Sequence, residues 1–459
     1  MTIDRALVDR ALTAATDTHQ LRLEAGALAA VASTFTSAFG SRSARVVADP
    51  TTWHVAGQRV DNQLREARLA TQPAIVLAEP LHADFDRVLE LESALAAADA
   101  IPVVVGSGTL NDLTKLAAHR LGREYMVVAT AASMDGYAAF GASITRDGFK
   151  QTMACPAPAA ILADLDVLAA APTPLTAAGY GDLIGKVTAG ADWIVADALA
   201  VEPIDAAAWA MVQGPLRASL DAPEHLAAHD SAATERFFLG LVISGLAMQA
   251  TRSSRPASGA EHLISHLWEM TGLTHQGVSP SHGAKVGIGT VLVTMLYERL
   301  LSYDLTAIDA EACISALPDA ASVERAARSA LPAGEVADRA VVESLAKHPT
   351  ADQLRARLQI LPERWPDLQA RARRQLLPSG ELQRMLRALG AATSPADLGV
   401  SPTQLRADLL AARQIRRRYT VLDLAAEVGL LEPLVDEVVA VVAPPTSGQP
   451  LPPAPEAAR

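Results

Sequence analysis

Cysteine is scarce in this 459-residue sequence: Cys155 and Cys313 are the only two, and they form no CxxC pair. This excludes a scaffold held together by disulfides, and the low count fits a reducing compartment. A chain of this length can bury a large hydrophobic core, so it needs no disulfide or structural metal for stability. The length predicts two or three domains.

The sequence also has fewer positively than negatively charged residues. The chain has 39 Lys and Arg against 51 Asp and Glu, which gives a formal net charge of -12. The long-range field of such a protein repels nucleic acids and anionic membrane surfaces, so we expect neither as a partner. A small anionic substrate would therefore need a local cluster of cations.

No apolar run reaches the length of a membrane span. The longest, residues 237–250, contains Ser244 and Gln249 and is shorter than the roughly 20 apolar residues that a span requires. We predict that it forms a buried core helix. Charged residues interrupt the first ten positions, so we expect no signal peptide, no membrane insertion and a cytoplasmic location.

Short apolar runs alternate with helical patterns in the first part of the chain. Apolar residues at helical spacing predict helices over residues 60–69, 83–97 and 111–121. Strands are predicted at residues 45–48, 74–77, 102–105, 126–129 and 160–162. The alternation predicts an α/β domain over residues 1–174, with a parallel sheet that binds ligands beyond the carboxyl ends of its strands.

Helical patterns dominate the rest of the chain. We predict an all-α domain over residues 175–442, joined to the first domain at Pro172 and Pro174. Residues 362–418 are rich in Arg and Leu, but acidic residues interleave with the arginines, which indicates a solvent-exposed helical face rather than a nucleic-acid site. The proline-rich residues 443–459 are predicted to form a disordered tail.

A small glycine loop follows one predicted strand. Residues 102–105 lead into Gly106-Ser107-Gly108-Thr109, and a helical pattern follows. Glycines allow a pyrophosphate to approach the backbone, and the helix offers free N–H groups at its start. The third glycine of the dinucleotide fingerprint is missing, so a strand-to-helix turn that needs small residues is an equally good interpretation.

Polar residues follow two further predicted strands. Asp49 precedes Pro50, where its carboxylate suits either a ribose contact or an Asp-Pro turn. Residues 130–137, TAASMDGY, supply polar side chains after the strand at 126–129, or simply a small-residue loop that caps a helix. Because such loops lie at one edge of a parallel sheet, they can converge on a single crevice.

One carboxylate and two imidazoles in the helical part could gather around one metal ion: Asp182, His262 and His282. Such a set leaves an open coordination position, as catalytic zinc requires. Each residue also has a structural interpretation: Asp182 as a helix cap, His262 as a partner of Glu261, and His282 at a turn. Their separations are too long for spacing alone to select them.

These motifs together resemble the sn-glycerol-1-phosphate dehydrogenases, within the superfamily of iron-containing alcohol dehydrogenases and dehydroquinate synthases. The resemblance covers roughly residues 45–297. It rests on GSGTLNDLTK (106–115), TAASMDGY (130–137), Gly181-Asp182, RPASGAEH (255–262) and His282-Gly283. It implies a dehydroquinate synthase-like fold, in which a nucleotide-binding α/β domain precedes a helical domain and a divalent metal lies in the cleft between them.

The resemblance also implies roles for individual residues. Asp182, His262 and His282 are implied as ligands of Zn²⁺ or another divalent ion such as Ni²⁺ or Fe²⁺. Asp135 matches a substrate-contacting aspartate and His266 a second histidine near the metal, so both are predicted to be catalytic. The implied contacts of NAD or NADP are Asp49, Gly106, Ser107, Gly108, Thr109, Asp112, Thr130 and Ser133.

The implied activity is the NAD(P)- and metal-dependent interconversion of dihydroxyacetone phosphate and sn-glycerol 1-phosphate, a reaction of phospholipid metabolism, by a homo-oligomer. The substrate phosphate needs cations, and the candidates are Lys150, Lys186, Arg252, Arg255 and Lys285. Three alternatives remain open: a polyol dehydrogenase of the glycerol type, a dehydroquinate synthase-like cyclase that uses NAD transiently, and a nonenzymatic nucleotide-binding protein.

Overall fold

Six strands form one parallel sheet in the order β1-β8-β5-β4-β2-β3 in the computed structural model, which describes residues 5–147 and 149–442. A separate antiparallel pair, β6 and β7, lies beside it. The strands are β1 (Gln20–Glu24), β2 (Ala44–Ala48), β3 (Ile75–Val76), β4 (Ile101–Gly106), β5 (Met126–Ala129), β6 (Ala142–Arg146), β7 (Phe149–Met153) and β8 (Ala160–Asp164). The predicted tail, residues 443–459, lies outside the described residues.

Alternate residues of the central strands face opposite sides of the sheet. Val103 and Val105 pack against α2 and α4, whereas Val104 packs against α5 and α6 on the other side. Both faces are covered, which explains why these strands read as continuous apolar runs. The helices of this part are α1 (Arg5–Ala14), α2 (Val31–Phe39), α3 (Pro50–Thr52), α4 (Gln58–Glu66), α5 (Phe85–Ala96), α6 (Gly108–Arg120) and α7 (Leu165–Ala169).

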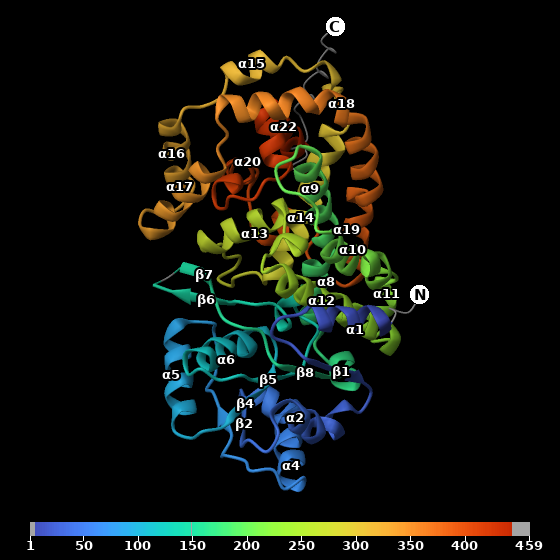
Figure 1. Cartoon of the computed structure of the whole chain (residues 1–459), viewed down its shortest axis with the longest axis vertical. Helices are drawn as coiled ribbons and strands as arrows, with labels where there is room; N and C mark the ends of the chain where they lie inside the picture. The colour runs from blue at the N-terminus through green and yellow to red at the C-terminus, as the bar shows by residue number, and fades with distance from the viewer. Residues whose placement is uncertain (1–4, 148, 443–459) are drawn as a thin grey trace.

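Helices alone make up the other part of the molecule, which lies above the sheet in Figure 1. Its first helix, α8, begins at Thr173 with proline in its first turn, a position that proline suits. Helix α8 ends at Ile184. The remaining long helices here are α9 (Lys186–Ala198), α10 (Ala206–Leu220), α12 (Ser231–Thr251), α13 (Ala260–Met270), α14 (His282–Leu300), α16 (Ala320–Ser329), α17 (Glu335–Lys347), α18 (Ala351–Gln375), α19 (Ser379–Ala388), α20 (Pro402–Ala411) and α22 (Leu431–Val442). Short helices between them are α11 (Pro223–Ala227), α15 (Ala310–Ser315) and α21 (Val421–Glu427).

One hydrophobic core runs from the sheet into the helical part. It joins Val104 and Val127 of the strands to Leu183 of α8 and Phe238 of α12. By length and composition α12 could cross a membrane, but 78% of its apolar window is buried inside the protein, as predicted for a core helix. The N-terminal helix α1 also packs on α12, so it contacts the helical part (Figure 1). The boundary at residue 174 stays a prediction.

The sheet has a topological switch point between β2 and β4. From β2 the chain continues to its neighbour β3 at one edge, whereas from β4 it continues through β5 towards the other edge. Parallel sheets bind ligands outside the carboxyl ends of the strands at such a point. Beyond the carboxyl end of β5, the backbone N–H of Asp135 donates to Asp182 of α8, so this edge of the sheet faces the helical part.

Candidate active site

Asp182, His262 and His282 converge although they come from three helices. Their donor atoms all lie within 4.8 Å of one another, and His262 Nε2 is 3.5 Å from Asp182 Oδ1. Asp182 and His262 are buried, and His282 is half-buried at the start of α14. The fold therefore brings together the three residues that the sequence predicted as a metal site.

Two glycines allow α8 and α14 to approach closely beside these ligands. A Cβ on Gly181 would lie 2.1 Å from the carbonyl oxygen of Gly283, and a Cβ on Gly283 would lie 1.7 Å from that of Ala178. Both distances are far below van der Waals contact, so only glycine fits at either position. Because Gly181 precedes Asp182 and Gly283 follows His282, this contact sets the distance between the two ligands.

The start of α13 is fixed by two buried carboxylates. Asp192 Oδ2 accepts a hydrogen bond from the N–H of Ala260 at 2.7 Å, and Glu261 Oε1 accepts one from the N–H of Gly259 at 2.6 Å. These bonds satisfy N–H groups that the first turn of a helix leaves without partners. They therefore hold the turn that presents His262.

Carboxylates also orient the imidazoles. His262 Nδ1 lies 2.8 Å from Glu261 Oε1, and His282 Nδ1 lies 2.9 Å from Glu269 Oε1. These bonds leave Nε2 of each ring for a metal, and such a carboxylate–histidine pair is the usual support of a metal-bound imidazole. A carboxylate oxygen and two imidazole nitrogens suit zinc, with room for a further ligand. The residues thus fit a divalent ion.

Lys186 compensates the charge of Asp182. Its Nζ lies 2.6 Å from Asp182 Oδ1 and 2.9 Å from Asp135 Oδ2. Burial favours the neutral acid, but Lys186 and the neighbouring histidines outweigh it and hold the pKa of Asp182 well below its usual value. Asp182 is therefore ionised, as a metal ligand must be.

His266 is the third imidazole of the cluster. Its ring centroid is 6.0 Å from that of His262 and 5.7 Å from that of His282, and its Nδ1 lies 3.2 Å from Glu269 Oε2. Burial, together with the positive charge of Arg416, lowers the pKa of His266 well below its usual value. The ring is therefore neutral at physiological pH.

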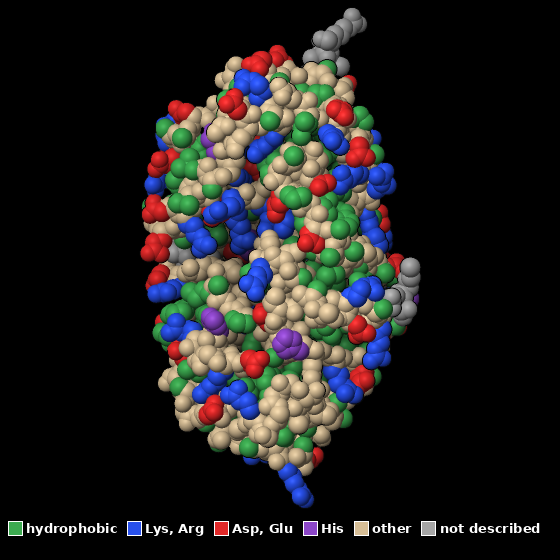
Figure 2. Space-filling model, in the orientation of Figure 1, with side chains coloured by type: hydrophobic (Ala, Val, Ile, Leu, Met, Phe, Trp, Pro, Cys, Tyr) green, Lys and Arg blue, Asp and Glu red, His purple; other side chains and the backbone are tan. Residues whose placement is uncertain are grey.

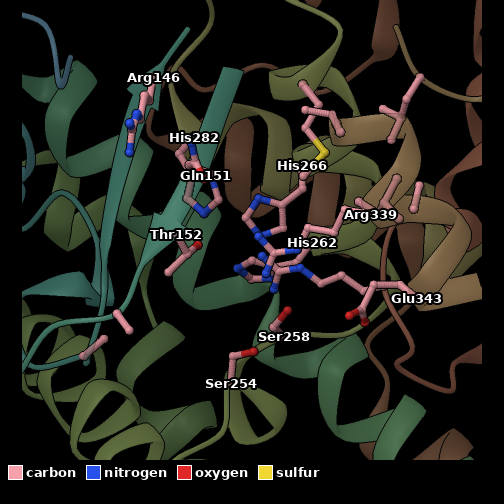
Figure 3. Close-up of a pocket in the computed structure, with 18 of the residues that line it drawn as sticks. Arg146, Gln151, Thr152, Ser254, Ser258, His262, His266, His282, Arg339 and Glu343 are labelled. Carbon is pink, nitrogen blue, oxygen red and sulfur yellow. The ribbon is translucent and has the colours of Figure 1, made fainter. Parts of the chain in front are cut away.

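The three histidines line a pocket of about 560 Å³ that also includes Asp135. In Figure 3, Arg146, Gln151 and Thr152 of the β6–β7 hairpin stand on one side and Arg339 and Glu343 of α17 on the other, with His262 and His266 between them. Ser254 and Ser258 also line the pocket. The pocket therefore lies where the sheet side, through its hairpin, meets the helical part.

The cations proposed from the sequence for the substrate phosphate are placed elsewhere. Lys186 is buried between two carboxylates, Lys285 pairs with Glu269 at 3.4 Å, and Arg255 bonds two buried carbonyl groups. Arg252 lies outside the pocket lining, and the side chain of Lys150 lies outside the described residues.

Instead, Arg339 and Arg416 line the pocket, and sequence reasoning missed both. The prediction that residues 362–418 present a solvent-exposed face is wrong for Arg416 and Arg418. The guanidinium of Arg418 donates to Ser254 and Ser258, and burial lowers its pKa to about 9. No local pattern marks these residues, because the basic run 416–418 looks like any solvated helix end.

A second crevice lies at the switch point of the sheet. Asp49, Ser107 and Thr109 line it, together with Glu79 after β3. Asp49 also accepts the N–H of Thr52 at 2.7 Å and so caps α3, which means that its structural and binding interpretations coexist. Residues beyond both β2 and β4 thus meet where a nucleotide is expected to bind.

Glycine is required in the loop for packing as well. A Cβ on Gly106 would lie 2.4 Å from Leu110, and one on Gly108 would lie 2.8 Å from the sulfur of Met134. The loop 106–109 and the loop 130–137 therefore lie side by side, and the N–H of Thr130 donates to the carbonyl of Gly106 at 3.1 Å.

The remaining predicted cofactor residues differ in their placement. Ser133, in the second loop, lies 3.3 Å from the hydroxyl of Tyr137. Asp112 does not join the crevice: its Oδ2 accepts the N–H of Ser143 at 3.0 Å, and Oδ1 lies 3.7 Å from Lys115. Its carboxylate supports the β6–β7 hairpin.

Comparison with known proteins agrees with this geometry. Residues 22–172 match the model of the iron-containing alcohol dehydrogenase family. A curated relative, the glycerol-1-phosphate dehydrogenase [NAD(P)+] of Halalkalibacterium halodurans, is 33% identical over 380 residues, which cover 82% of this chain and 84% of the relative. The chain belongs to the glycerol-1-phosphate dehydrogenase family. A relative of the same name from Methanosarcina barkeri is 34% identical over 258 residues, which cover 56% of this chain and 70% of the relative.

Solved structures share the fold of this glycerol-1-phosphate dehydrogenase family member. A probable glycerol dehydrogenase from Sinorhizobium meliloti matches with a TM-score of 0.58 and 17% identity, over 92% of this chain and 98% of its own. A maleylacetate reductase from Agrobacterium tumefaciens matches with a TM-score of 0.57 and 18% identity, over 91% and 96%. The family and the fold class expected from the sequence are thus confirmed.

Proposed function

We propose that this protein is an NAD(P)-dependent glycerol-1-phosphate dehydrogenase, which interconverts dihydroxyacetone phosphate and sn-glycerol 1-phosphate by hydride transfer. The convergence of Asp182, His262 and His282 carries the proposal, because a carboxylate and two imidazoles beside a pocket can hold a divalent ion next to a small substrate. The relatives' names supply the substrate and the cofactor class.

The residues at the switch point of the sheet would hold the cofactor, and the start of α6 would hold its pyrophosphate. Ser107 and Thr109 line this crevice, Gly106 and Gly108 keep the backbone accessible, and Asp49 faces the adenosine side. Thr130 and Ser133 follow the neighbouring strand β5 and lie towards the helical part, on the side of the nicotinamide. When bound, the cofactor supplies or accepts the hydride.

Asp182, His262 and His282 would hold the metal, and zinc, nickel and iron are the candidates. A divalent ion bound there would polarise the substrate carbonyl and lower the pKa of the alcohol. Lys186 keeps Asp182 ionised, and Glu261 and Glu269 keep Nδ1 of the two histidines occupied so that Nε2 faces the ion.

Asp135 and His266 act on the substrate itself. Lys186 and the hydroxyl of Ser244 both bond Asp135 Oδ2, so its Oδ1 is the oxygen that can accept a hydrogen bond from a substrate hydroxyl. His266 is neutral with Nδ1 bound to Glu269, so its Nε2 accepts the proton of the alcohol during oxidation and returns it during reduction.

The test is a nicotinamide-absorbance assay with dihydroxyacetone phosphate and with dihydroxyacetone, before and after chelation. We expect turnover of the phosphorylated substrate, its loss on chelation and in His262→Ala, and recovery of the chelated wild type when a divalent metal is added back. Full turnover by the metal-free protein would contradict the mechanism. Equal rates with dihydroxyacetone would favour a polyol dehydrogenase, and consumption of substrate without net cofactor turnover would favour a cyclase.

A further inference from the structure

Two arginines in the active-site pocket lie near carboxylates without bonding them: Glu343 acts electrostatically on both Arg339 and Arg416. Arg339 lies on α17, and Arg416 follows the short 3₁₀ helix η7 (Ala412–Gln414). Within residues 5–147 and 149–442, no hydrogen bond or ion pair joins either guanidinium to another side chain that the structure places. Two unpaired cations in one pocket point to an anionic ligand.

The two arginines that follow Arg416 both have bonding partners, so the absence of one is specific to Arg416. Arg417 makes a two-pronged bond to Glu343, with distances of 2.8 and 3.0 Å. Arg418 donates to the backbone and hydroxyl of Ser254 and to the carbonyl of Ser258. Of three consecutive arginines, only Arg416 is left with its charge directed at the pocket.

Two neighbouring guanidinium groups without an ion pair are energetically unfavourable in this pocket unless an anion binds between them. Arg416 is half-buried, and burial followed by the like charge of Arg339 lowers its pKa, although the charges of Glu343 and Glu269 offset part of this effect. Glu343 is ion-paired with Arg417, and Glu269 bonds His266 and His282. Figure 2 shows that Lys and Arg side chains gather over the region between α17 and the β6–β7 hairpin, although the net charge of the chain is -12. An anion here would gain from both guanidinium groups.

We propose that Arg339 and Arg416 bind the phosphate group of the substrate and so select phosphorylated over unphosphorylated ketones. This inference rests on the proposed function. In dihydroxyacetone phosphate the phosphorus is only three bonds from the carbonyl carbon, so its phosphate must lie in the pocket that holds the metal ligands. Arg339 and Arg416 line that pocket together with His262, His266 and His282.

A serine hydroxyl completes the phosphate site. Ser258 lines the pocket, and its buried Oγ has no hydrogen-bond partner among the residues that the structure describes. A buried hydroxyl without a partner is unfavourable, and a phosphate oxygen would satisfy it. Arg418 holds the backbone of Ser258 in place and is thus a positioning residue.

The test compares Arg339→Gln and Arg416→Gln with the wild type on dihydroxyacetone phosphate and on dihydroxyacetone. We expect the ratio of kcat/KM for dihydroxyacetone phosphate to kcat/KM for dihydroxyacetone to fall on the order of 10- to 100-fold in each variant, the range of charge-assisted hydrogen bonds. The ratio is the readout because Arg416 also lowers the pKa of His266, so its loss affects the rate on both ketones. Arg416→Lys, which keeps the charge without the fork of donors, should recover part of the loss.

Matched controls are Arg325→Gln and Arg384→Gln. Both arginines are exposed and bind partners outside the pocket, Ser322 and Glu224. Each control variant removes the same charge as a pocket variant. An equal loss of preference for the phosphorylated ketone in the controls would indicate long-range attraction rather than binding and would overturn the proposal. An unchanged preference for the phosphorylated ketone in both pocket variants would overturn it as well, and the proposed function would stand.

Binding of inorganic phosphate to the zinc-loaded protein, measured by calorimetry, separates the two hypotheses without any turnover. Phosphate should bind the wild type and the two controls, and binding should weaken in both pocket variants. If the wild type does not reduce dihydroxyacetone phosphate but phosphate still binds through these arginines, the proposed function fails and the anion site stands. Equal phosphate binding by wild type and pocket variants would overturn the anion site itself.

Discussion

Each imidazole in and beside the candidate metal site is oriented by a carboxylate that lies behind it. Glu261 binds His262, and Glu269 binds both His266 and His282 with its two oxygens. A carboxylate in this position fixes which ring nitrogen carries the proton and makes the other nitrogen a stronger ligand. The metal affinity therefore depends on residues that do not line the pocket.

Glu261→Gln tests this dependence with little change in shape. The amide oxygen can still accept from His262 and Gly259, and the amide nitrogen can donate to the hydroxyl of Thr188, which bonds the other oxygen in the wild type. We expect the fold to persist and the affinity for zinc to fall about 10- to 100-fold, because a neutral acceptor makes the imidazole less basic. Competition with a chromophoric chelator measures the affinity.

Glu298→Gln is the control for the loss of one negative charge, because Glu298 is exposed and, among the residues that the structure describes, bonds only Ser379. Its zinc affinity should equal that of the wild type. A folded Glu261→Gln protein with unchanged zinc affinity would contradict the supporting role of Glu261.

At the level of helices and strands, the sequence is most informative where elements are buried on both faces. Four strands of apolar residues, β2, β4, β5 and β8, were predicted close to their observed bounds, whereas β3 is shorter than predicted. The edge strand β1, Gln20–Glu24, was missed because its polar residues alternate with two leucines. The β6–β7 hairpin was also missed, although its strands flank Asp147-Gly148, a pair typical of tight hairpin turns.

The active site was predictable only in part. The residues beside Asp182, His262 and His282 resemble a family, and the fold brings these three together as expected. Arg339 and Arg416 could not be found in this way, because their shared pocket depends on how η7 packs against α17. The roles of the individual site residues stay predictions, as do the homo-oligomer and the cytoplasmic location.

The contact between α8 and α14 predicts the effect of Gly283→Ala. A methyl group would meet the carbonyl of Ala178, so the two helices must separate or bend. We expect the free energy of unfolding to fall by about 1–3 kcal/mol, the range for overpacked cores. Zinc affinity should fall too, because Asp182 and His282 move apart with their helices. Urea unfolding and zinc titration measure the two effects.

Gly380→Ala is the matched control. Gly380 is exposed in the first turn of α19, and a Cβ there would meet nothing within 4 Å. Because alanine favours a helix by up to about 1 kcal/mol over glycine, stability should stay the same or rise slightly. Identical zinc affinity and stability in Gly283→Ala and Gly380→Ala would show that the helices do not need this close contact.

At the scale of the whole molecule, the sheet and the helices act as one structure because their core is continuous. A buried polar group ties the same parts together. Gln249 on α12 accepts hydrogen bonds from the N–H groups of Asp17 and Thr18, which precede β1, at 3.0 and 3.2 Å. Its amide nitrogen donates to the hydroxyl of Thr18 and to the carbonyl of Ala138. One side chain thus joins three segments that are distant in sequence.

Replacement of Gln249 by Met keeps the volume of this side chain and removes its hydrogen bonds. Two backbone N–H groups and the carbonyl of Ala138 lose their partner, and each buried group left without one costs about 1–3 kcal/mol. We expect a lower urea midpoint for the whole protein. We also expect a higher KM for dihydroxyacetone phosphate, because Ala138 follows closely on Asp135, which we propose as a substrate contact. Gln58→Met, at an exposed position at the start of α4, should change neither quantity. If Gln249→Met unfolds at the wild-type urea midpoint, the sheet and the helical part are held together by their apolar contact alone, and the hydrogen bonds of Gln249 contribute nothing to stability.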